Sequence, residues 1–275
     1  MKHTFILHSK DIKKGAKIAK DTKSNFYLHK NHIELKCNEV LNLAAIRNKY
    51  RLDINAVPKN FDFSKAELFL SDMDSTLINI ECVDEIADFQ NIKDKVQKIT
   101  DLAMQGKLNF DQSLIKRVAM LKGLSEYVLD IVYNERLKIN KGGEKLISFL
   151  KKRKLKLALV SGGFTFFTDK LKDKLKLDFC LANKLEIENN CLTGKVIGKI
   201  INADAKALFL KHLCNEHNID IRTTIVAGDG ANDLKMLQNA GLSISYHGNK
   251  ILKDKVDIII DYGGLDKIID FFEIK

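Results

Sequence analysis

The sequence predicts an α/β protein with a parallel sheet whose two faces are covered by helices, preceded by a small α+β domain. Short apolar runs recur from residue 66 onward, and most of them end in polar or glycine-rich residues. Segments with apolar residues at helical spacing separate the runs. This alternation is typical of parallel sheets that are buried on both faces. The runs that predict strands are Leu68–Leu70, Leu155–Val160, Ile225–Ala227, Leu242–Ser245 and Ile258–Ile260.

Two insertions interrupt the alternation of strands and helices. Residues from about 80 to 140 follow the first strand, and the stretch from Glu81 to Lys122 carries apolar residues at helical spacing. We expect these helices to form a cap over the sheet. Leu181–Gly194 holds Asn189-Asn190 between two short apolar runs, which predicts a hairpin.

Residues 1–57 show a separate pattern, in the order β-α-β-β-α-β of the ferredoxin-like motif. Pro58, which is the only proline, and the polar residues up to Lys65 predict a linker at 58–65, so that the main domain covers 66–275. The expected elements are the strand Phe5–Leu7, the helix Ile12–Ala19, the strands Phe26–His29 and Ile33–Lys36, the helix Glu39–Lys49 capped by Asn38, and the strand Leu52–Ala56.

Composition narrows the range of partners. The 275 residues are 45% apolar and carry a formal net charge of +10. A basic chain attracts nucleic acid, anionic membranes or small anionic ligands. The lysines are mostly single or paired among acidic residues and have no interleaved aromatics, which favours a solvated surface over nucleic-acid binding. No apolar run reaches the roughly 18 residues of a membrane span, so no membrane partner is expected.

Cysteine usage predicts the compartment. The five cysteines are scattered and form no C-x-x-C pair, and the N-terminus has no apolar signal-like stretch. This pattern indicates reduced thiols in a cytoplasmic protein. The cysteines are Cys37, Cys82, Cys180, Cys191 and Cys214.

Two carboxylates stand directly after the first predicted strand. Asp72 and Asp74 flank Met73. Residues i and i+2 of a strand point the same way, and ligands of parallel sheets bind at the carboxyl ends of strands, so both carboxylates can approach one ligand. A lone D-x-D pattern is weak evidence, whereas D-x-D-S-T after a buried strand is much stronger.

Two further strands end in motifs of the same kind. Ser161-Gly162-Gly163 offers a hydroxyl and backbone N–H groups to an oxyanion, although a simple turn explains that tripeptide equally well. Gly228–Asp233 contains Asp229 and Asp233, which suit a hard divalent cation, although a glycine turn with an Asp helix cap has the same pattern. Three such motifs at three strand ends make ordinary turns a poor explanation.

With these motifs the sequence resembles the haloacid dehalogenase superfamily and, within it, the phosphoserine phosphatases. The resemblance runs from about Glu67 to the C-terminus. The family usually has Pro-Gly where this chain has Lys141-Gly142-Gly143, outside the catalytic motifs, so we expect a changed loop rather than lost activity. The matching segments are Asp72–Thr76, Ser161–Phe164, Asn202–Lys206, Gly228–Asp233 and, in the insertion, Glu81–Ala87 and Met104–Phe110.

The resemblance implies a covalent mechanism. Asp72 would be the nucleophile that forms an aspartyl-phosphate, and Asp74 would act as general acid and then general base. Lys206 would add positive charge beside Asp72 and the phosphoryl oxygens. Mg²⁺ is expected at Asp72, the Asp74 backbone carbonyl and Asp229. Asp233 would orient waters or Lys206 from a second shell.

The resemblance also assigns the groups that bind a phosphomonoester substrate. In the cap, Glu81 would pair with the ammonium of serine and Arg117 with its carboxylate, while Met104 and Phe110 would form apolar walls. Apart from the family, each of these four has an ordinary explanation as a helix-end, surface or packing residue. The groups expected to bind the phosphoryl oxygens are Ser161, the N–H of Gly162 and Asn232.

The implied function is hydrolysis of O-phospho-L-serine to L-serine and phosphate, the last step of serine biosynthesis. A phosphotransferase that passes phosphate to an alcohol such as homoserine stays open. A phosphatase for another amine phosphate, such as phosphoethanolamine, is disfavoured by Arg117, because that substrate has no carboxylate. An amino-acid-binding regulatory protein is disfavoured by the complete catalytic set.

The N-terminal segment resembles ACT domains in its element order only. Such domains bind amino acids and often pair across a dimer, so serine feedback or a homodimer is one expectation. Gly15 lies inside the predicted first helix rather than in the loop that a ligand usually approaches. A docking or stabilising role is therefore the interpretation we favour.

Overall fold

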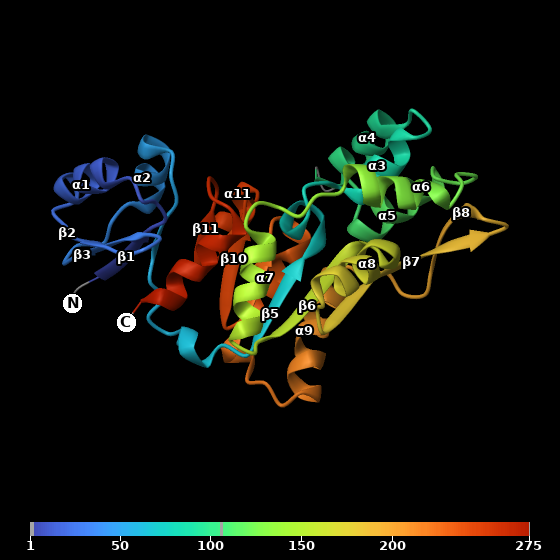
Figure 1. Cartoon of the computed structure of the whole chain (residues 1–275). Helices are drawn as coiled ribbons and strands as arrows, with labels where there is room; N and C mark the ends of the chain where they lie inside the picture. The colour runs from blue at the N-terminus through green and yellow to red at the C-terminus, as the bar shows by residue number, and fades with distance from the viewer. Residues whose placement is uncertain (1–2, 105–106, 275) are drawn as a thin grey trace.

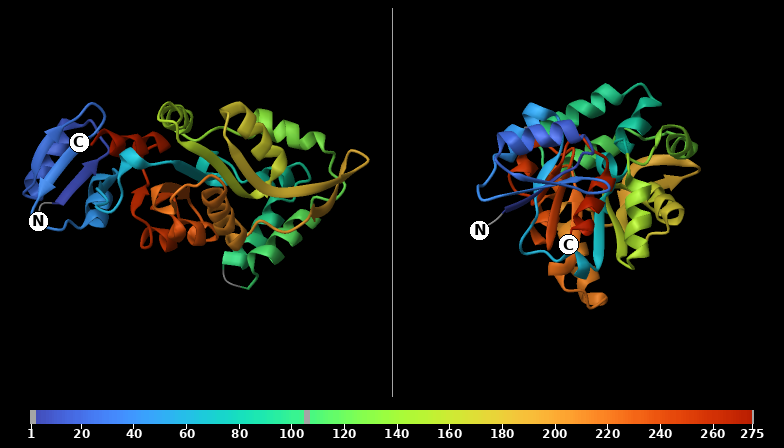
Figure 2. Two further views of the ribbon diagram at one scale, coloured as in Figure 1. Left: turned by 90° about the horizontal axis from the view of Figure 1, so that it is seen from below. Right: turned by 60° about the vertical axis from the view of Figure 1, so that its left-hand side comes forward.

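The computed structural model describes residues 3–104 and 107–274. The molecule is elongated, with a small N-terminal domain at one end, a large sheet in the middle, and a helical cap with a long hairpin at the other end (Figures 1 and 2). Within the described residues, every helix is too short or too polar to span a bilayer.

The central sheet has seven strands in the order β11-β10-β9-β5-β6-β7-β8. All neighbouring pairs are parallel except β7 and β8, which are antiparallel. The predicted fold class is therefore confirmed. The strands are β5 (Leu68–Asp72), β6 (Lys156–Phe164), β7 (Phe179–Glu188), β8 (Cys191–Ile197), β9 (Thr224–Gly228), β10 (Leu242–Tyr246) and β11 (Ile258–Ile260).

Helices cover both faces of this sheet because strand residues alternate between them. In β5, Leu68 and Leu70 pack into one core with the helices α9 (Ala203–Glu216), α10 (Leu234–Asn239) and α11 (Lys250–Lys253). Phe69 belongs to the core on the other face. That core is completed by α7 (Gly143–Lys152), α8 (Thr165–Leu175) and the C-terminal helical turns Leu265–Glu273.

The cap is inserted between β5 and β6, as the helical spacing predicts. The β7–β8 hairpin turns at Asn189 and Asn190, both in the left-handed region with φ of 49° and 61°. The hairpin holds the cap through backbone bonds, since Leu192 accepts from Gly123 at 2.8 Å and donates to Leu124 at 2.8 Å. The cap helices are α3 (Cys82–Asp88), α4 (Lys93–Met104), α5 (Phe110–Ala119) and α6 (Tyr127–Ile131), followed by the helical turn Val132–Arg136.

The N-terminal domain is a four-stranded antiparallel sheet in the order β2-β3-β1-β4, with two helices. The expected element order is present, but the second helix begins at Leu43 rather than Glu39, and its cap is Asn42 rather than Asn38. The side chain of Asn42 accepts from the N–H of Ala45 at 3.0 Å, which fixes the first turn there. The elements are β1 (His3–Leu7), α1 (Ile12–Asp21), β2 (Asn25–Leu28), β3 (Ile33–Cys37), α2 (Leu43–Tyr50) and β4 (Ile54–Ala56).

An aromatic cluster packs the segment that connects the two sheets against the C-terminal turns. Phe61 is buried and contacts Phe63 edge-on, with ring centroids 4.9 Å apart. Phe63 in turn stacks on Phe271 at 5.4 Å and meets Phe272 at 5.2 Å, so the connection packs against the C-terminal turns. These contacts could not be predicted from the polar composition of Lys59–Lys65, because they come from Phe61 and Phe63 alone.

Candidate active site

The first motif lies at the carboxyl end of β5, where the chain leaves the strand in a tight turn. Ser75 takes a left-handed conformation with φ 58°. The turn brings Asp74 against two partners: Oδ1 accepts from the N–H of Cys82 at 2.9 Å, and Oδ2 accepts from the Ser161 hydroxyl at 3.0 Å. Asp74 is thereby held between Cys82, at the start of the inserted helices, and Ser161 of the second motif.

A buried lysine joins the first motif to the last. Lys206 extends from α9, is fully buried, and donates to Asp72 and, at 2.7 Å, to Asp233. Burial alone would lower the pKa of Lys206, but the carboxylates of Asp233 and Asp72 outweigh burial and raise the pKa. Burial raises the pKa of Asp72, and the Asp233 charge raises it further, while Lys206 opposes both effects. The single positive charge of Lys206 thus faces two carboxylates, Asp72 and Asp233, and cannot neutralise both.

The loop after β9 supplies the remaining carboxylates. Asp233 Oδ2 accepts from the N–H groups of Asp229 and Gly230, each at 3.1 Å, so both of its oxygens have protein partners. Asp229 Oδ1 accepts from the Thr76 hydroxyl at 3.0 Å. Burial, followed by the charge of Asp233, raises the pKa of Asp229 to about 7.

The geometry of these carboxylates fits a divalent cation. Oxygens of Asp72, Asp229 and Asp233 all lie within 4.8 Å of one another. An all-oxygen donor set with excess negative charge suits a hard cation. Asp233 uses both oxygens to bind Lys206 and the loop backbone, whereas Asp72 and Asp229 each bind the protein through one oxygen in the described structure.

The second motif packs closely between the first motif and the cap. The Ser161 hydroxyl accepts from the N–H of Gly163 at 2.7 Å while it donates to Asp74. A Cβ at Gly163 would lie 2.6 Å from Asp74 Oδ2, and a Cβ at Gly162 would lie 2.6 Å from the Phe110 ring. A side chain at either position would clash with a neighbouring residue, so both glycines are needed for this packing. A simple turn would not need a glycine at both positions.

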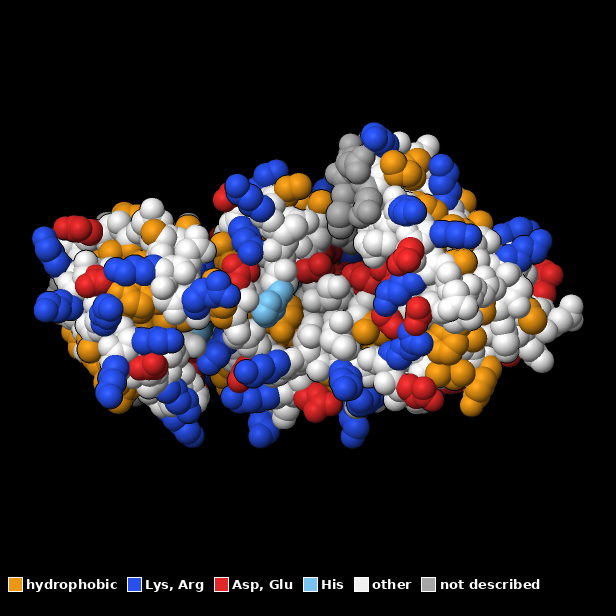
Figure 3. Space-filling view, turned by 90° about the horizontal axis from the view of Figure 1, so that it is seen from above, with side chains coloured by type: hydrophobic (Ala, Val, Ile, Leu, Met, Phe, Trp, Pro, Cys, Tyr) orange, Lys and Arg blue, Asp and Glu red, His pale blue; other side chains and the backbone are white. Residues whose placement is uncertain are grey.

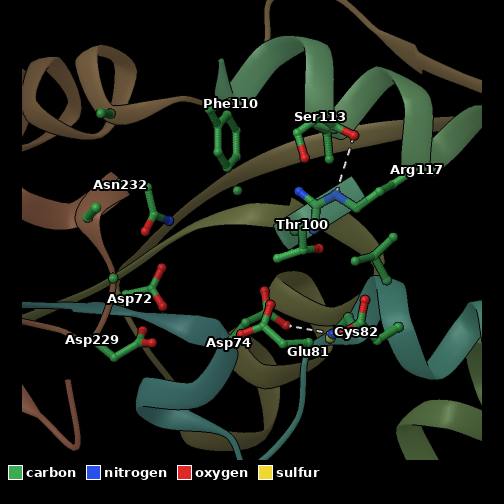
Figure 4. A pocket seen from close by; sticks show the side chains of 18 of the residues that line it. Asp72, Asp74, Glu81, Cys82, Thr100, Phe110, Ser113, Arg117, Asp229 and Asn232 are labelled. Atoms are coloured by element: carbon green, nitrogen blue, oxygen red, sulfur yellow. Dashed lines mark hydrogen bonds between the residues drawn. The ribbon is translucent and has the colours of Figure 1, made fainter. Parts of the chain in front are cut away.

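A cleft of about 700 Å³ separates the sheet from the cap. Acidic side chains gather in the hollow between these two parts (Figure 3). Phe110, Arg117 and Asn232 point into the space beside Asp72 and Asp74 (Figure 4). The structure thus brings Glu81, Phe110 and Arg117 of the cap to one cavity with the predicted catalytic carboxylates.

The two charged cap residues differ in their protein partners. Glu81 lines the cleft and accepts from the Ser75 hydroxyl at 2.7 Å. Lost hydration and then the charge of Asp74 raise the pKa of the Glu81 carboxyl. Arg117 contacts only the Ser113 carbonyl, at 3.4 Å, and within the described residues no carboxylate lies within 4.0 Å of its guanidinium. The side chain of Met104 lies outside the described part of the chain.

Sequence reasoning missed several polar residues of this site. Thr76 bonds Asp229, and buried Asn183 donates to the Gly162 carbonyl at 2.8 Å. The hydroxyls of Thr100 and Ser113 line the cleft and have no hydrogen-bond partner in the described structure. A signal was available for Ser113, because it lies four residues before Arg117 on one helix face. None was available for Asn183, which comes from the hairpin.

Comparison with known proteins agrees with this architecture. Residues 69–238 match the family model of the haloacid dehalogenase-like hydrolases. A crystal structure of a haloacid dehalogenase family hydrolase from Salmonella enterica serovar Typhi superposes with a TM-score of 0.90 at 28% identity, covering 100% of this chain and 99% of that one. The chain therefore belongs to the haloacid dehalogenase-like hydrolases.

More similar relatives narrow the family. A phosphoserine phosphatase from Polaromonas sp. is 42% identical over 224 residues, which are 80% of this chain and 95% of the relative. A solved phosphoserine phosphatase that holds an analogue of the phospho-aspartyl intermediate is 41% identical, with a TM-score of 0.71 over 75% of this chain and 98% of that one. Within the hydrolases, the chain falls in the phosphoserine phosphatase family.

Proposed function

We propose that this protein hydrolyses O-phospho-L-serine to L-serine and phosphate. The observation that carries the proposal is the pairing of two features in one cleft. Asp72 lies beside Lys206 at the base of the cleft. Arg117, which has no carboxylate partner among the described residues, faces Asp72 from the cap. The first feature suits phosphoryl transfer, and the second suits a substrate that carries a carboxylate.

Chemistry at Asp72 proceeds in two steps. Its carboxylate oxygen attacks phosphorus, the P–O bond to serine breaks, and Asp74 gives its proton to the departing serine oxygen. In the second step Asp74 takes a proton from water, whose oxygen attacks the aspartyl-phosphate and releases phosphate. The contact between Ser161 and Asp74 at 3.0 Å supports this role, because it orients the carboxyl that must exchange the proton.

Mg²⁺ is the cation that we assign to the carboxylate cluster. The side chains of Asp72 and Asp229 and the backbone carbonyl of Asp74 would hold it, and Asp233 would orient the surroundings. When bound, the ion offsets the repulsion between the carboxylates and a phosphate dianion. Lys206 acts in the same direction from within the protein, since its buried ammonium contacts Asp72 directly.

The remaining site groups divide between the phosphate and the amino acid. Ser161, the N–H of Gly162 and Asn232 would bind the phosphoryl oxygens. Glu81 would pair with the substrate ammonium, and its raised pKa falls when that positive charge arrives. Arg117 would bind the carboxylate with two parallel hydrogen bonds.

The substrate lies among apolar and polar walls that suit a small amino acid. Phe110 covers Gly162 and closes one side of the cleft. Met104, whose side chain lies outside the described residues, is proposed as a second apolar wall. All five cysteines are free thiols, which supports the proposed cytoplasmic location. The proposed place in serine biosynthesis follows from the proposed substrate and product.

Turnover of purified protein tests the proposal. Phosphate release from L-phosphoserine should require Mg²⁺, stop in excess chelator and return on adding Mg²⁺. Phosphoethanolamine, which lacks the carboxylate, should be hydrolysed far more slowly. Addition of homoserine separates the phosphotransferase alternative, because transfer would lower phosphate release and yield phosphohomoserine. Equal rates on both amine phosphates would contradict the substrate assignment.

A further inference from the structure

A second group of metal-ligating side chains lies far from the active site, where the N-terminal domain meets the C-terminal turns. His32 precedes β3, and Asp270 and Glu273 belong to the turns Leu265–Glu273. His32 Nδ1 lies 3.9 Å from Asp270 Oδ1 and 4.0 Å from Glu273 Oε2. All three ligand atoms lie within 4.8 Å of one another. The mechanism proposed above uses none of them.

His32 is the anomaly at this junction. Its side chain is fully buried, and neither ring nitrogen has a hydrogen-bond partner in the described structure. A buried polar group without a partner destabilises the folded state, so it needs an explanation. One face of its ring stacks on His29, with centroids 4.6 Å apart and planes at 8°, which fixes the ring orientation.

The neighbouring His8 shows that an ordinary histidine at this junction is satisfied. His8 Nδ1 bonds Asp270 Oδ2 at 2.8 Å, and its Nε2 faces the amide of Asn55 at 3.2 Å. Both nitrogens of His8 therefore have partners. The lack of hydrogen-bond partners is therefore particular to His32 and is not shared by the other histidine at this interface.

Both acidic side chains are held in place by a second partner. Asp270 uses Oδ2 for His8 and leaves Oδ1 facing His32. Glu273 accepts from the Asn31 side chain at 3.2 and 3.3 Å. Partners of this kind orient metal ligands in many sites. Burial lowers the pKa of His32, so its ring is neutral at neutral pH, as a metal ligand must be.

We propose that His32, Asp270 and Glu273 form a binding site for a divalent transition-metal ion of the zinc type. One imidazole nitrogen and two carboxylate oxygens favour Zn²⁺ over Mg²⁺, which prefers oxygen alone. In a tetrahedral zinc site with bonds of about 2.1 Å, neighbouring ligand atoms lie roughly 3.4 Å apart, so a small contraction completes the geometry. Glu273 is one-third exposed, which leaves water as the fourth ligand.

The site would act as a clamp between domains. His32 belongs to the N-terminal domain, whereas Asp270 and Glu273 belong to the turns that pack on the central sheet. An ion bound there ties the two parts together and stabilises the folded state by mass action. The clamp is independent of phosphoserine hydrolysis, because its ligands are separate from the all-oxygen cluster at Asp72.

Zinc binding to the purified full-length protein tests this site. Excess Mg²⁺ keeps the catalytic cluster occupied, and bound Zn²⁺ is measured by elemental analysis and by competition with a chromophoric chelator. Asp229→Asn, which weakens the catalytic cluster, should still bind one Zn²⁺ tightly. His32→Gln and Glu273→Gln should weaken binding at least about a hundredfold, since loss of outer-shell groups alone costs 10–100-fold.

His212→Gln is the matched control. His212 lies 3.0 Å from Glu216 on an exposed helix surface, so it offers a histidine–carboxylate pair that is not buried. It should leave zinc affinity unchanged, and Zn²⁺ should raise the melting temperature of this variant as in the natural sequence. If His32→Gln fails to fold, partly exposed Glu273 still reports on the site. Unchanged affinity in Glu273→Gln, or loss of zinc binding in Asp229→Asn, would overturn the proposal.

Discussion

At the scale of single residues, the most consequential contact is the buried ion pair between Lys206 and Asp72. A fully buried ammonium is costly unless carboxylates surround it, and here two of them do. The same arrangement places positive charge beside the carboxylate that we propose as the nucleophile. We therefore expect removal of the lysine to lower both stability and catalysis.

Asp72→Asn should abolish phosphoserine turnover, by at least about a thousandfold, because an amide is not a nucleophile. The fold should persist, since the amide oxygen still accepts from Lys206. Steady-state phosphate release and circular dichroism measure the two effects. A second variant, Asp74→Asn, tests the general acid and base. It should slow both formation and hydrolysis of the aspartyl-phosphate. Near-normal turnover by Asp72→Asn would rule out the covalent mechanism.

Arg117→Ala should impair phosphoserine hydrolysis far more than hydrolysis of an aryl phosphate, which has no carboxylate. The lost charge-assisted bonds should cost about 2 kcal/mol or more, which is roughly thirtyfold in kcat/KM. Lys116→Ala is the matched control, because Lys116 is the exposed basic neighbour on the same helix. It should leave both substrates unaffected. An equal loss on both substrates in Arg117→Ala would make the arginine a structural residue.

At the scale of elements, the pairing of β6 and β7 shapes the second motif, Ser161–Gly163, which we propose binds the phosphoryl oxygens. The pairing of these strands shifts register between Val160 and Phe164, which spans the second motif. Asn183 of β7 bridges that irregularity, donating to the Gly162 carbonyl and accepting from the N–H of Ile201, both at 2.8 Å. One buried amide thus fixes two loops at the edge of the cleft.

Asn183→Ala should destabilise the protein by about 1–3 kcal/mol, because it leaves a buried carbonyl and N–H without partners. It should also lower kcat/KM for phosphoserine through displacement of Gly162. Urea unfolding and steady-state kinetics measure these effects. Asn239→Ala, which removes an exposed amide bond to the Lys235 carbonyl, should change neither. Wild-type kinetics in a destabilised Asn183→Ala protein would limit this residue to a structural role.

Elements that sequence predicted well share one property, which is that local residues determine them. The apolar strands, the helical insertion and the Asn189-Asn190 turn depend on period and turn chemistry alone. The start of α2 was predicted wrongly because two asparagines offered a cap and only the folded backbone selects Asn42. The contact of Asn183 with Gly162 could not be predicted, because it depends on the sheet register between distant segments.

The same distinction applies to the candidate site. The motifs at the carboxyl ends of β5, β6 and β9 could be placed together from sequence, because parallel strands present these ends at one edge of the sheet. Their roles came from the family resemblance. Two features could be seen only in the folded structure: the lack of a carboxylate partner for Arg117 among the described residues, and the cluster of His32, Asp270 and Glu273. Nothing in the sequence around His32 brings Asp270 near it.

At the scale of the whole molecule, the N-terminal domain covers an edge of the central sheet. The Asn55 side chain bonds both the N–H and the carbonyl of Ile259 in the edge strand β11, each at 2.9 Å. Asp53 accepts from the N–H of Asp261 at 2.7 Å and of Gly263 at 2.6 Å. Edge strands are prone to aggregate when exposed, so these contacts protect the sheet. We propose docking and protection as the role of residues 1–57.

A protein that starts near Phe63 should therefore keep phosphoserine hydrolysis but lose stability. All proposed catalytic and metal-binding residues of the cleft lie after Ser71, and a solved phosphoserine phosphatase is matched over 98% of its length by three-quarters of this chain. Removal of residues 1–62 exposes β11 and the hydrophobic contacts of the docking face. We expect the melting temperature to fall by more than about 5 °C and aggregation to increase.

Comparison of the full-length and truncated proteins separates docking from catalysis. Rate per folded molecule, inhibition by serine and mass in solution are measured for both. Similar rates with reduced thermal stability would support the docking role. Loss of serine inhibition or of a dimer on truncation would assign the domain a regulatory function as well. A well-folded truncated protein without activity would mean that the N-terminal domain shapes the cleft, because the contacts of Asp53 reach the loop whose Gly263 carbonyl bonds His247 at the cleft wall.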